Sequence, residues 1–208
     1  MKAGGIRVYI VDDDAKIRTM VGRMLACAGR ESQEFASATA FLQALPTLPP
    51  GCVLLDINMP DESGLAVLTR LERLPLPVIM VSGSPDVGDA ITAFRRGAVH
   101  FVRKPFRRAA LLDALTEAQA VLSARQAEIA RRAAAERIHL TPREREVLGA
   151  MADGQQSKAI AWQLGLSIRT VEMHRSNLLA KFEAANATQA VATARALDLL
   201  PAAVAVAA

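Results

Sequence analysis

Asp12, Asp13, Asp56, Ser82 and Lys104 stand out because each lies at or just beyond the end of a short apolar run. Together they offer three carboxylates, one hydroxyl and one ammonium group. Mg²⁺ prefers a few carboxylates combined with water and phosphate oxygens. An aspartate can also accept a phosphoryl group and form an acyl phosphate. The set therefore predicts phosphoryl chemistry at Asp56, with a divalent cation and with Lys104 and Ser82 contacting the phosphoryl oxygens.

The apolar runs before these residues have the length and composition of buried β-strands. The runs are IRVYIV, CVLL, PVIMV and HFV. About 4–8 apolar residues, rich in β-branched side chains, fit a strand that is covered on both faces of a parallel sheet. Ligands of open parallel α/β sheets bind beyond the carboxyl ends of the strands. The reactive side chains are therefore expected to meet at one edge of a sheet.

Helical patterns alternate with the strands in the first half of the chain. Apolar stripes at helical spacing cover residues 17–28, 65–71, 87–94 and 111–122. Gly29 and Gly97 follow two of these stripes, as expected for the glycine after a helix C-terminus. The weakest strand signal lies near residues 33–36. This alternation predicts right-handed βαβ units around a parallel sheet.

Residues 109–137 contain no glycine and no proline and consist largely of good helix formers. Leu115, Leu122 and Ile129 recur every seven residues, whereas Arg125 and Arg132 occupy the second seam position. Two interpretations stay open for this segment. One is a solvated helical linker, and the other is a short dimerising coiled coil.

The last seventy residues predict four helices with clear boundaries. Thr141 and Glu144 form a capping-box pattern around Pro142 at the first helical position. Further caps are expected at Ser157, at Gly165, at Ser167, and at Asn186 or Thr188, and the fourth helix is expected to reach Leu200.

The composition excludes several classes of protein. Of the residues, 51% are hydrophobic, but no run of about 18 uncharged apolar residues exists, which argues against a membrane span. The acidic residues near the N-terminus also argue against a secretory signal. Cys27 and Cys52 predict neither a disulfide framework nor a zinc site, and we expect both to be buried in a protein of the reducing cytosol. The net charge of +4 is only a mild indication of a polyanionic partner.

Four segments of the first half resemble the signature segments of response-regulator receiver domains: VDDD, LLDINMPDESG, VSGSPDV and GAVHFVRKPF. The resemblance covers residues 5–125 and implies a doubly wound, five-stranded parallel α/β sheet of strand order 2-1-3-4-5. It implies that Asp56 is the phosphoacceptor. Asp12 and Asp13 would hold Mg²⁺ together with Asp56 and the backbone carbonyl of Asn58.

The same resemblance assigns the residues that surround the phosphoryl group. Ser82 matches the switch hydroxyl, Lys104 the lysine of the site, and Phe101 the rotating aromatic residue. The Lys104–Pro105 bond matches one that is cis in the family. The family also tunes the lifetime of its phosphoryl group at the positions of Asn58 and Ser84.

Phosphatases of the haloacid-dehalogenase type also use an aspartyl nucleophile on an α/β sheet. They need a second aspartate two residues later as a general acid. Asn58 occupies that position and its amide cannot deliver a proton, so the sequence argues against this enzyme class.

Residues 139–200 resemble the LuxR/FixJ/NarL-type helix-turn-helix domain through LTPREREVL, GQQSKAIAWQLGLSIRTVEMHRSNLLAKF and NATQAV. Glu172, Met173 and Ser176 are expected to read base edges from the helix that begins at Ile168. Phosphate contacts position a protein on DNA without specifying the sequence. The residues expected to make them, or to lie beside the backbone, are Lys158, Arg169, Thr170, His174, Arg175 and Lys181.

This half departs from the family pattern at several positions. Ala159 replaces a usual glutamate, and Ala185 and Ala187 lie where the family often has arginine. Glu172 would repel phosphates unless it accepts a hydrogen bond from cytosine. These departures predict weak DNA binding by one copy and a dependence on dimerisation.

The sequence therefore predicts a cytoplasmic response regulator that is not an enzyme. We expect a receiver domain at residues 1–123, a helical linker at 124–138 and a DNA-binding domain at 139–208. A sensor histidine kinase would phosphorylate Asp56, and the resulting homodimer would bind double-stranded promoter DNA, most simply as an activator. RNA polymerase is a further candidate partner, and no membrane contact is expected. The alternative is a phosphorylation-independent DNA-binding regulator whose first domain serves as a dimerisation scaffold.

Overall fold

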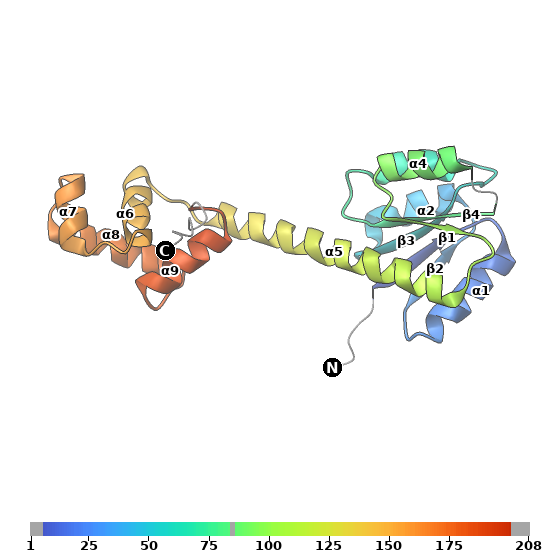
Figure 1. Ribbon diagram of the computed structural model, residues 1–208, viewed down its shortest axis with the longest axis horizontal. Coiled ribbons are helices and arrows are strands. Elements are labelled where there is room, and N and C mark those ends of the chain that lie inside the picture. Colours follow the sequence, from blue (N-terminus) through green and yellow to red (C-terminus); the bar gives the residue numbers. More distant parts are fainter. Residues whose placement is uncertain (1–5, 84–85, 201–208) are drawn as a thin grey trace. The chain divides into compact units, whose positions relative to one another are not determined.

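The computed structural model describes residues 6–83 and 86–200 of the chain (Figure 1). The expectation for Ser84 lies outside these residues. The chain divides into two compact units, Met1–Gln126 and Ala127–Ala208. We call them the sheet unit and the helical unit and describe each by itself.

The sheet unit contains five parallel strands in the order β2-β1-β3-β4-β5, which confirms the expected topology. The β2 strand falls within one residue of its weak sequence signal. The bounds are β1 Arg7–Val11, β2 Ser32–Phe35, β3 Gly51–Asp56, β4 Val78–Ser82 and β5 His100–Arg103. Because β3 and β4 are buried at every residue, their sequences are continuously apolar up to the reactive residue.

Helices connect the strands and end close to the predicted positions. Their bounds are α1 Ala15–Ala26, α2 Ala38–Ala44, α3 Gly64–Leu71, α4 Val87–Arg95 and α5 Arg108–Arg137, with a 3₁₀ turn at Leu45–Thr47. The α2 helix was not identified from the sequence, because seven residues provide only two turns of periodicity. The α5 helix runs without interruption, as its lack of glycine and proline predicted.

Two apolar cores cover the two faces of the sheet. The α2, α3 and α4 helices pack on one face, where the core includes Tyr9, Phe41 and Leu68. The α1 and α5 helices pack on the other face, where it includes Ile10, Leu25 and Leu115 (Figure 1). The sheet is therefore covered on both sides.

The seven-residue repeat in α5 is explained by this packing. Leu115 and Leu122 are buried in the core of the sheet unit, so they are not available as a coiled-coil seam. Ile129, the next member of the repeat, is 53% exposed. Of the two interpretations, the helical linker fits these observations better.

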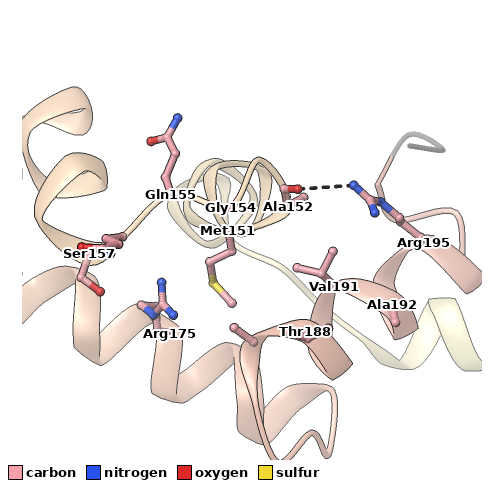
Figure 2. A pocket seen from close by; sticks show the side chains of 12 residues that line it. Met151, Ala152, Gly154, Gln155, Ser157, Arg175, Thr188, Val191, Ala192 and Arg195 are labelled. Atoms are coloured by element: carbon pink, nitrogen blue, oxygen red, sulfur yellow. Dashed lines mark hydrogen bonds between the residues drawn. The ribbon is translucent and has the colours of Figure 1, made fainter. Parts of the chain in front are cut away.

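The helical unit contains α6 Pro142–Ala152, α7 Ser157–Leu164, α8 Ile168–Lys181 and α9 Ala187–Ala196. Val147, Leu148, Val171 and Leu178 are at the centre of its core. Met151 and Val191 belong to the same core where α6 meets α9 (Figure 2).

Most of the predicted caps are confirmed in the helical unit. Thr141 and Glu144 form the reciprocal capping box, Ser167 caps α8, and Asn186 caps α9. Two expectations were wrong. The cap of α7 is Gln156 rather than Ser157, and it makes no side-chain hydrogen bond. The α9 helix ends at Ala196 instead of Leu200, because the backbone turns to a positive φ at Asp198.

The two cysteines differ in their environments. Cys52 is buried as expected, whereas Cys27 is exposed because it caps the end of α1, so that expectation was wrong. Among the described residues, none of the helices is both long and apolar enough to cross a membrane.

Candidate functional site

Asp12, Asp13 and Asp56 meet at the carboxyl edge of the sheet. One carboxylate oxygen from each lies within 4.8 Å of the others. Asp12 and Asp56 are buried, at 3% and 5% exposure, whereas Asp13 is exposed. Three carboxylates at such a distance repel one another unless a cation is present. The predicted acidic triad therefore exists, and it is of the kind that is typical of a Mg²⁺ site.

Lys104 supplies the positive charge that the structure itself brings to this edge. Its Nζ lies 2.6 Å from Oδ2 of Asp12 and 3.2 Å from Oδ2 of Asp56. Burial alone would lower the pKa of Lys104. The hydrogen bond to Asp12 and the charges of Asp56 and Asp12 outweigh this effect and raise it. Lys104 is therefore held in its charged form between the two buried acids.

Asp56 is less completely paired than Asp12. Burial raises the pKa of Asp56, the charge of Lys104 lowers it, and the charge of Asp12 raises it further, so that the net direction is upward. Its buried Oδ1 has no hydrogen-bond partner among the described residues. An unsatisfied buried oxygen beside two other carboxylates fits a divalent cation, because the cation would supply the missing partner.

Two contacts that sequence reasoning missed hold this edge in place. Nη1 of Arg18, on α1, donates hydrogen bonds to the backbone carbonyls of Asp12 and Asp13 at 2.8 and 2.9 Å. A Cβ atom at Gly64 would lie 2.0 Å from the carbonyl oxygen of Asp56, so α3 can approach Asp56 only because this residue is glycine. A basic residue one turn into the helix after the acidic run is a signal that could have identified Arg18.

The remaining predicted residues surround the same edge. Ser82 ends β4 and is fully buried, and its carbonyl accepts a hydrogen bond from the N–H of Lys104 at 2.7 Å. Phe101 is half-buried on β5, Asn58 is exposed directly after β3, and the Lys104–Pro105 bond is cis. The structure thus places these residues on neighbouring strand ends, although it does not test their roles.

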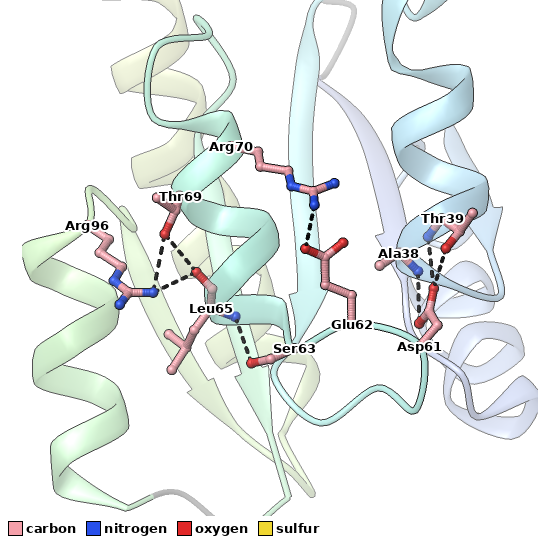
Figure 3. A network of polar contacts seen from close by, with 9 residues as sticks. All are labelled: Ala38, Thr39, Asp61, Glu62, Ser63, Leu65, Thr69, Arg70 and Arg96. Carbon is pink, nitrogen blue, oxygen red and sulfur yellow. Dashed lines mark hydrogen bonds and ion pairs between the residues drawn. The ribbon is translucent and has the colours of Figure 1, made fainter.

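The loop after Asp56 is tied to α2, and the neighbouring helices α3 and α4 are tied to each other (Figure 3). Asp61 accepts hydrogen bonds from the N–H and hydroxyl groups of Thr39, both at 2.9 Å, and these bonds lower the pKa of Asp61. Arg96, at the end of α4, donates to the carbonyl of Leu65 and the hydroxyl of Thr69 on α3. The segment that carries the acidic edge is therefore anchored to α2, and α3 is anchored to α4.

A second candidate site lies on the helical unit. The α7 and α8 helices are joined by a short turn in which Gly165 has a φ of +64°, which favours glycine. Val171 and Leu178 bury one side of α8, and its opposite side faces solvent. A short helix, a glycine-containing turn and a longer helix with one polar face form a helix-turn-helix motif.

The predicted base readers lie on the solvent side of α8. Glu172, Met173 and Ser176 are all exposed. Lys158 and Arg169 are exposed as well, and Thr170, His174 and Arg175 are half-buried. The exposed side chains can reach a groove without a change in the fold.

Lys181 differs from the other predicted phosphate contacts. Its Nζ lies 2.7 Å from Oε2 of Glu144 and 2.8 Å from the carbonyl oxygen of His139. Burial alone would raise the pKa of Glu144, but hydrogen bonds from Lys181 and Thr141 outweigh it and lower the pKa. Lys181 could reach a phosphate only by leaving these partners, so its first role is to connect α8 to the start of α6.

Two family models match the chain, one for each unit. Residues 8–116 match the response regulator receiver domain, and residues 139–194 match the bacterial regulatory proteins of the luxR family. Both matches coincide with the segments that carry the two candidate sites.

Curated relatives match this chain across both units. The transcriptional regulatory protein FixJ of Bradyrhizobium diazoefficiens is 36% identical over 93% of this chain and 96% of its own length. The C4-dicarboxylate transport transcriptional regulatory protein DctR of Rhodobacter capsulatus is 38% identical over 86% and 94%. Among solved structures, the response regulator StyR gives a TM-score of 0.78 at 30% identity, covering 91% of this chain and 98% of StyR. Full-length FixJ from B. japonicum gives 0.61 at 33% identity, covering 96% and 100%.

Proposed function

This chain belongs to the FixJ-type response regulators, DNA-binding transcription regulators with a receiver and a LuxR-type domain, and we propose that phosphorylation of Asp56 switches its DNA binding. The observation that carries the proposal is the unpartnered Oδ1 of Asp56 within the acidic triad. We also propose that the receiver domain spans residues 1–123, the linker 124–138 and the DNA-binding domain 139–208. The protein would act in the cytoplasm, where it can contact both DNA and the kinase domain.

The phosphodonor in this proposal is a phosphohistidine of a sensor histidine kinase. A carboxylate oxygen of Asp56 forms a bond to phosphorus as the phosphorus–nitrogen bond breaks, and the histidine leaves with the electron pair. Asp12 and Asp13 would hold Mg²⁺, with Asp56 and the Asn58 carbonyl as further ligands. The metal would neutralise charge on the phosphoryl oxygens.

Lys104 and Ser82 then respond to the new phosphoryl group. The ammonium of Lys104, now bonded to Asp12 and paired with Asp56, can contact a phosphoryl oxygen with little movement. The hydroxyl of Ser82 turns toward the phosphoryl group, and Phe101 moves inward behind it. The phosphoryl group favours this arrangement only because it interacts better with it than with the unphosphorylated one.

Dimerisation is the expected consequence, and α4 offers a surface for it. Val87, Ile91 and Phe94 form the apolar stripe of α4, yet they are 75%, 49% and 51% exposed. Exposed apolar stripes of this kind often mark a surface that binds another protein. A homodimer would present two α8 helices to double-stranded promoter DNA, with RNA polymerase as a further partner.

The proposal is tested with Asp56→Asn, acetyl phosphate as the donor, and Mg²⁺. Wild type is expected to form a phosphoprotein, to dimerise and to bind DNA more tightly, whereas Asp56→Asn should do none of these. Asp61→Asn is the matched control, because it changes a carboxylate in the same loop outside the triad. If Asp56→Asn dimerises and binds DNA as donor-treated wild type does, the proposed phosphorylation switch is wrong. The protein would then be a phosphorylation-independent DNA-binding regulator.

A further inference from the structure

The helical unit contains an open pocket of about 590 Å³. It lies where the end of α6, the start of α7, the middle of α8 and one side of α9 come together (Figure 2). Its floor is apolar and includes Met151 and Val191. None of the predicted base readers lines it, whereas Arg175, one of the predicted phosphate contacts, does.

The pocket carries positive charge. Arg175, from α8, and Arg195, from α9, both line it, and none of the described lining residues is acidic. Figure 2 shows the two guanidinium groups on opposite sides, with Met151 and Val191 between them. The pocket therefore favours an anionic ligand that spans both sides.

Neither arginine is fully used within the protein. Arg175 makes no hydrogen bond or ion pair with any residue that the structure describes. Arg195 donates one long hydrogen bond of 3.4 Å from Nη2 to the carbonyl of Ala152, and its buried Nε has no partner. A buried donor without a partner is unfavourable, and more so when the group is charged.

Within the described part of the chain, two buried side-chain atoms lack a hydrogen-bond partner: Nε of Arg195 and Oδ1 of Asp56. That oxygen lies where a cation is expected to bind. By the same physical reasoning, an unpartnered arginine nitrogen indicates a site for an anion. The planar guanidinium group, with five donors, matches the oxygens of phosphate especially well.

Neutral donors lie beside the two arginines. The hydroxyl groups of Ser157 and Thr188 line the pocket near the first turns of α7 and α9. No side chain caps α7, so the N–H groups of Ser157 and Lys158 are available to a ligand, whereas that of Ala159 donates to the carbonyl of Gln156. Helix N-termini favour anions because their N–H groups and the helix dipole both attract negative charge.

We propose that this pocket binds the sugar-phosphate backbone of DNA, with Arg175 and Arg195 each facing a phosphate. The inference rests on the DNA-binding part of the proposed function. Phosphate could also come from a small molecule, but Arg175 shares α8 with the base readers, and this favours the DNA whose groove α8 enters. The apolar floor would contact the deoxyribose rings. Arg195 lies outside the helix-turn-helix motif, so α9 becomes part of the DNA interface.

The test compares Arg195→Gln and Arg175→Gln with Arg145→Gln. Arg145 is an exposed arginine on α6 that does not line the pocket, so its loss changes the net charge of the helical unit equally. Binding is measured by fluorescence anisotropy on a duplex that wild type selects from a random pool, and on an unrelated duplex. Each pocket variant should weaken binding to both duplexes by about tenfold and reduce the salt slope by about 0.9 relative to Arg145→Gln.

Arg195→Lys keeps the charge without the planar fork, so it should retain the salt slope and lose part of the affinity. If Arg195→Gln proves unstable in circular dichroism, this variant and Arg175→Gln still decide the question. The inference would be overturned if the pocket variants showed the same salt dependence of DNA binding as Arg145→Gln. It would also be overturned if inorganic phosphate bound DNA-free wild type through Arg195 while the variants bound DNA normally, because the ligand would then be a small molecule. If wild type selects no duplex at all, the proposed DNA-binding function fails, and the inference fails with it.

Discussion

Asp56 of the sheet unit and Glu144 of the helical unit are both buried carboxylates, at 5% and 4% exposure, and both face a lysine. Their pKa values nevertheless move in opposite directions from those of ordinary carboxyl groups. The pKa of Asp56 is raised, chiefly by burial, whereas hydrogen bonds from Lys181 and Thr141 lower the pKa of Glu144 in spite of burial.

The difference lies in how completely each carboxylate is paired. Glu144 has its own lysine at 2.7 Å and the N–H of Thr141 at 2.8 Å. Asp56 shares Lys104 with Asp12, which takes the shorter contact, and its Oδ1 has no partner among the described residues.

The two environments suit different tasks. A buried polar group with all its partners makes the fold rigid and specific. A buried charge that lacks partners is costly, and such groups are concentrated at functional sites because a ligand can complete them. Glu144 therefore fits a structural role, whereas Asp56 has the incomplete pairing that the proposed metal and phosphoryl group would complete.

Mg²⁺ should give the largest contrast between the two units. A ligand that binds only the folded state stabilises it by about 2.7 kcal/mol at 100 times its Kd. Hydrogen exchange followed by mass spectrometry should show stronger protection of β1 and β3 with Mg²⁺ than with a chelator, and no change in α6 and α8. Asp13→Asn should weaken this effect. Equal protection of both units would contradict the assignment of the metal site to the sheet unit.

Replacement of Glu144, the fully paired carboxylate, should give the second largest effect. Glu144→Ala removes the capping box and leaves Lys181 with one partner, so we expect a loss of about 2 kcal/mol in the stability of the helical unit. Glu146→Ala is the control, because Glu146 forms an exposed pair with Arg143 and should cost less than about 0.5 kcal/mol. Urea unfolding measures both. Similar losses would show that Glu144 is not the structural residue inferred here.

The opposite sign is expected for the incompletely paired carboxylate. Asp56→Asn removes a buried charge that shares Lys104 with Asp12 and is repelled by Asp12, so we expect the sheet unit to gain about 1 kcal/mol in the absence of Mg²⁺. Phosphorylation should be lost at the same time. A loss of stability in urea unfolding would mean that Lys104 compensates the charge of Asp56 fully.

The smallest effect is the dependence of stability on pH, measured without divalent ions as the difference between each variant and wild type. The contribution of Glu144 is present above the unfolded pKa of about 4.3 and is lost as the pH falls through the lowered folded pKa. The contribution of Asp56 is present below about 3.9 and is lost as the pH rises through the raised folded pKa. Acidification should therefore diminish the effect of Glu144→Ala and that of Asp56→Asn. If the stability difference between each variant and wild type grows on acidification, the pKa directions assigned to Glu144 and Asp56 are both wrong.

The strands at the site could be predicted because burial on both faces leaves a direct mark on the sequence. A continuous apolar run such as CVLL needs no partner to be recognised, and Asp56 follows from its end. Capping boxes are equally local, since Thr141 and Glu144 are three residues apart.

The sequence-based predictions failed or stayed incomplete where contacts between residues far apart in the chain determine the structure. The α2 helix is stabilised at its start by Asp61, which lies more than twenty residues later in the chain. Periodicity showed that Val87, Ile91 and Phe94 share a face, but not that this face is exposed. It likewise grouped Leu115 with Leu122 without showing that the sheet buries them.

The sequence by itself determined the order of elements, the chemistry at the strand ends and the helix-turn-helix pattern, because these depend on neighbouring residues. Only the tertiary structure decided which charged groups are satisfied. Lys181 is paired with Glu144, whereas Asp56 and Arg195 each keep a buried atom without a partner. The reason is physical: hydrogen bonding and desolvation depend on distances of a few ångströms between residues far apart in the chain, and no local pattern encodes those distances.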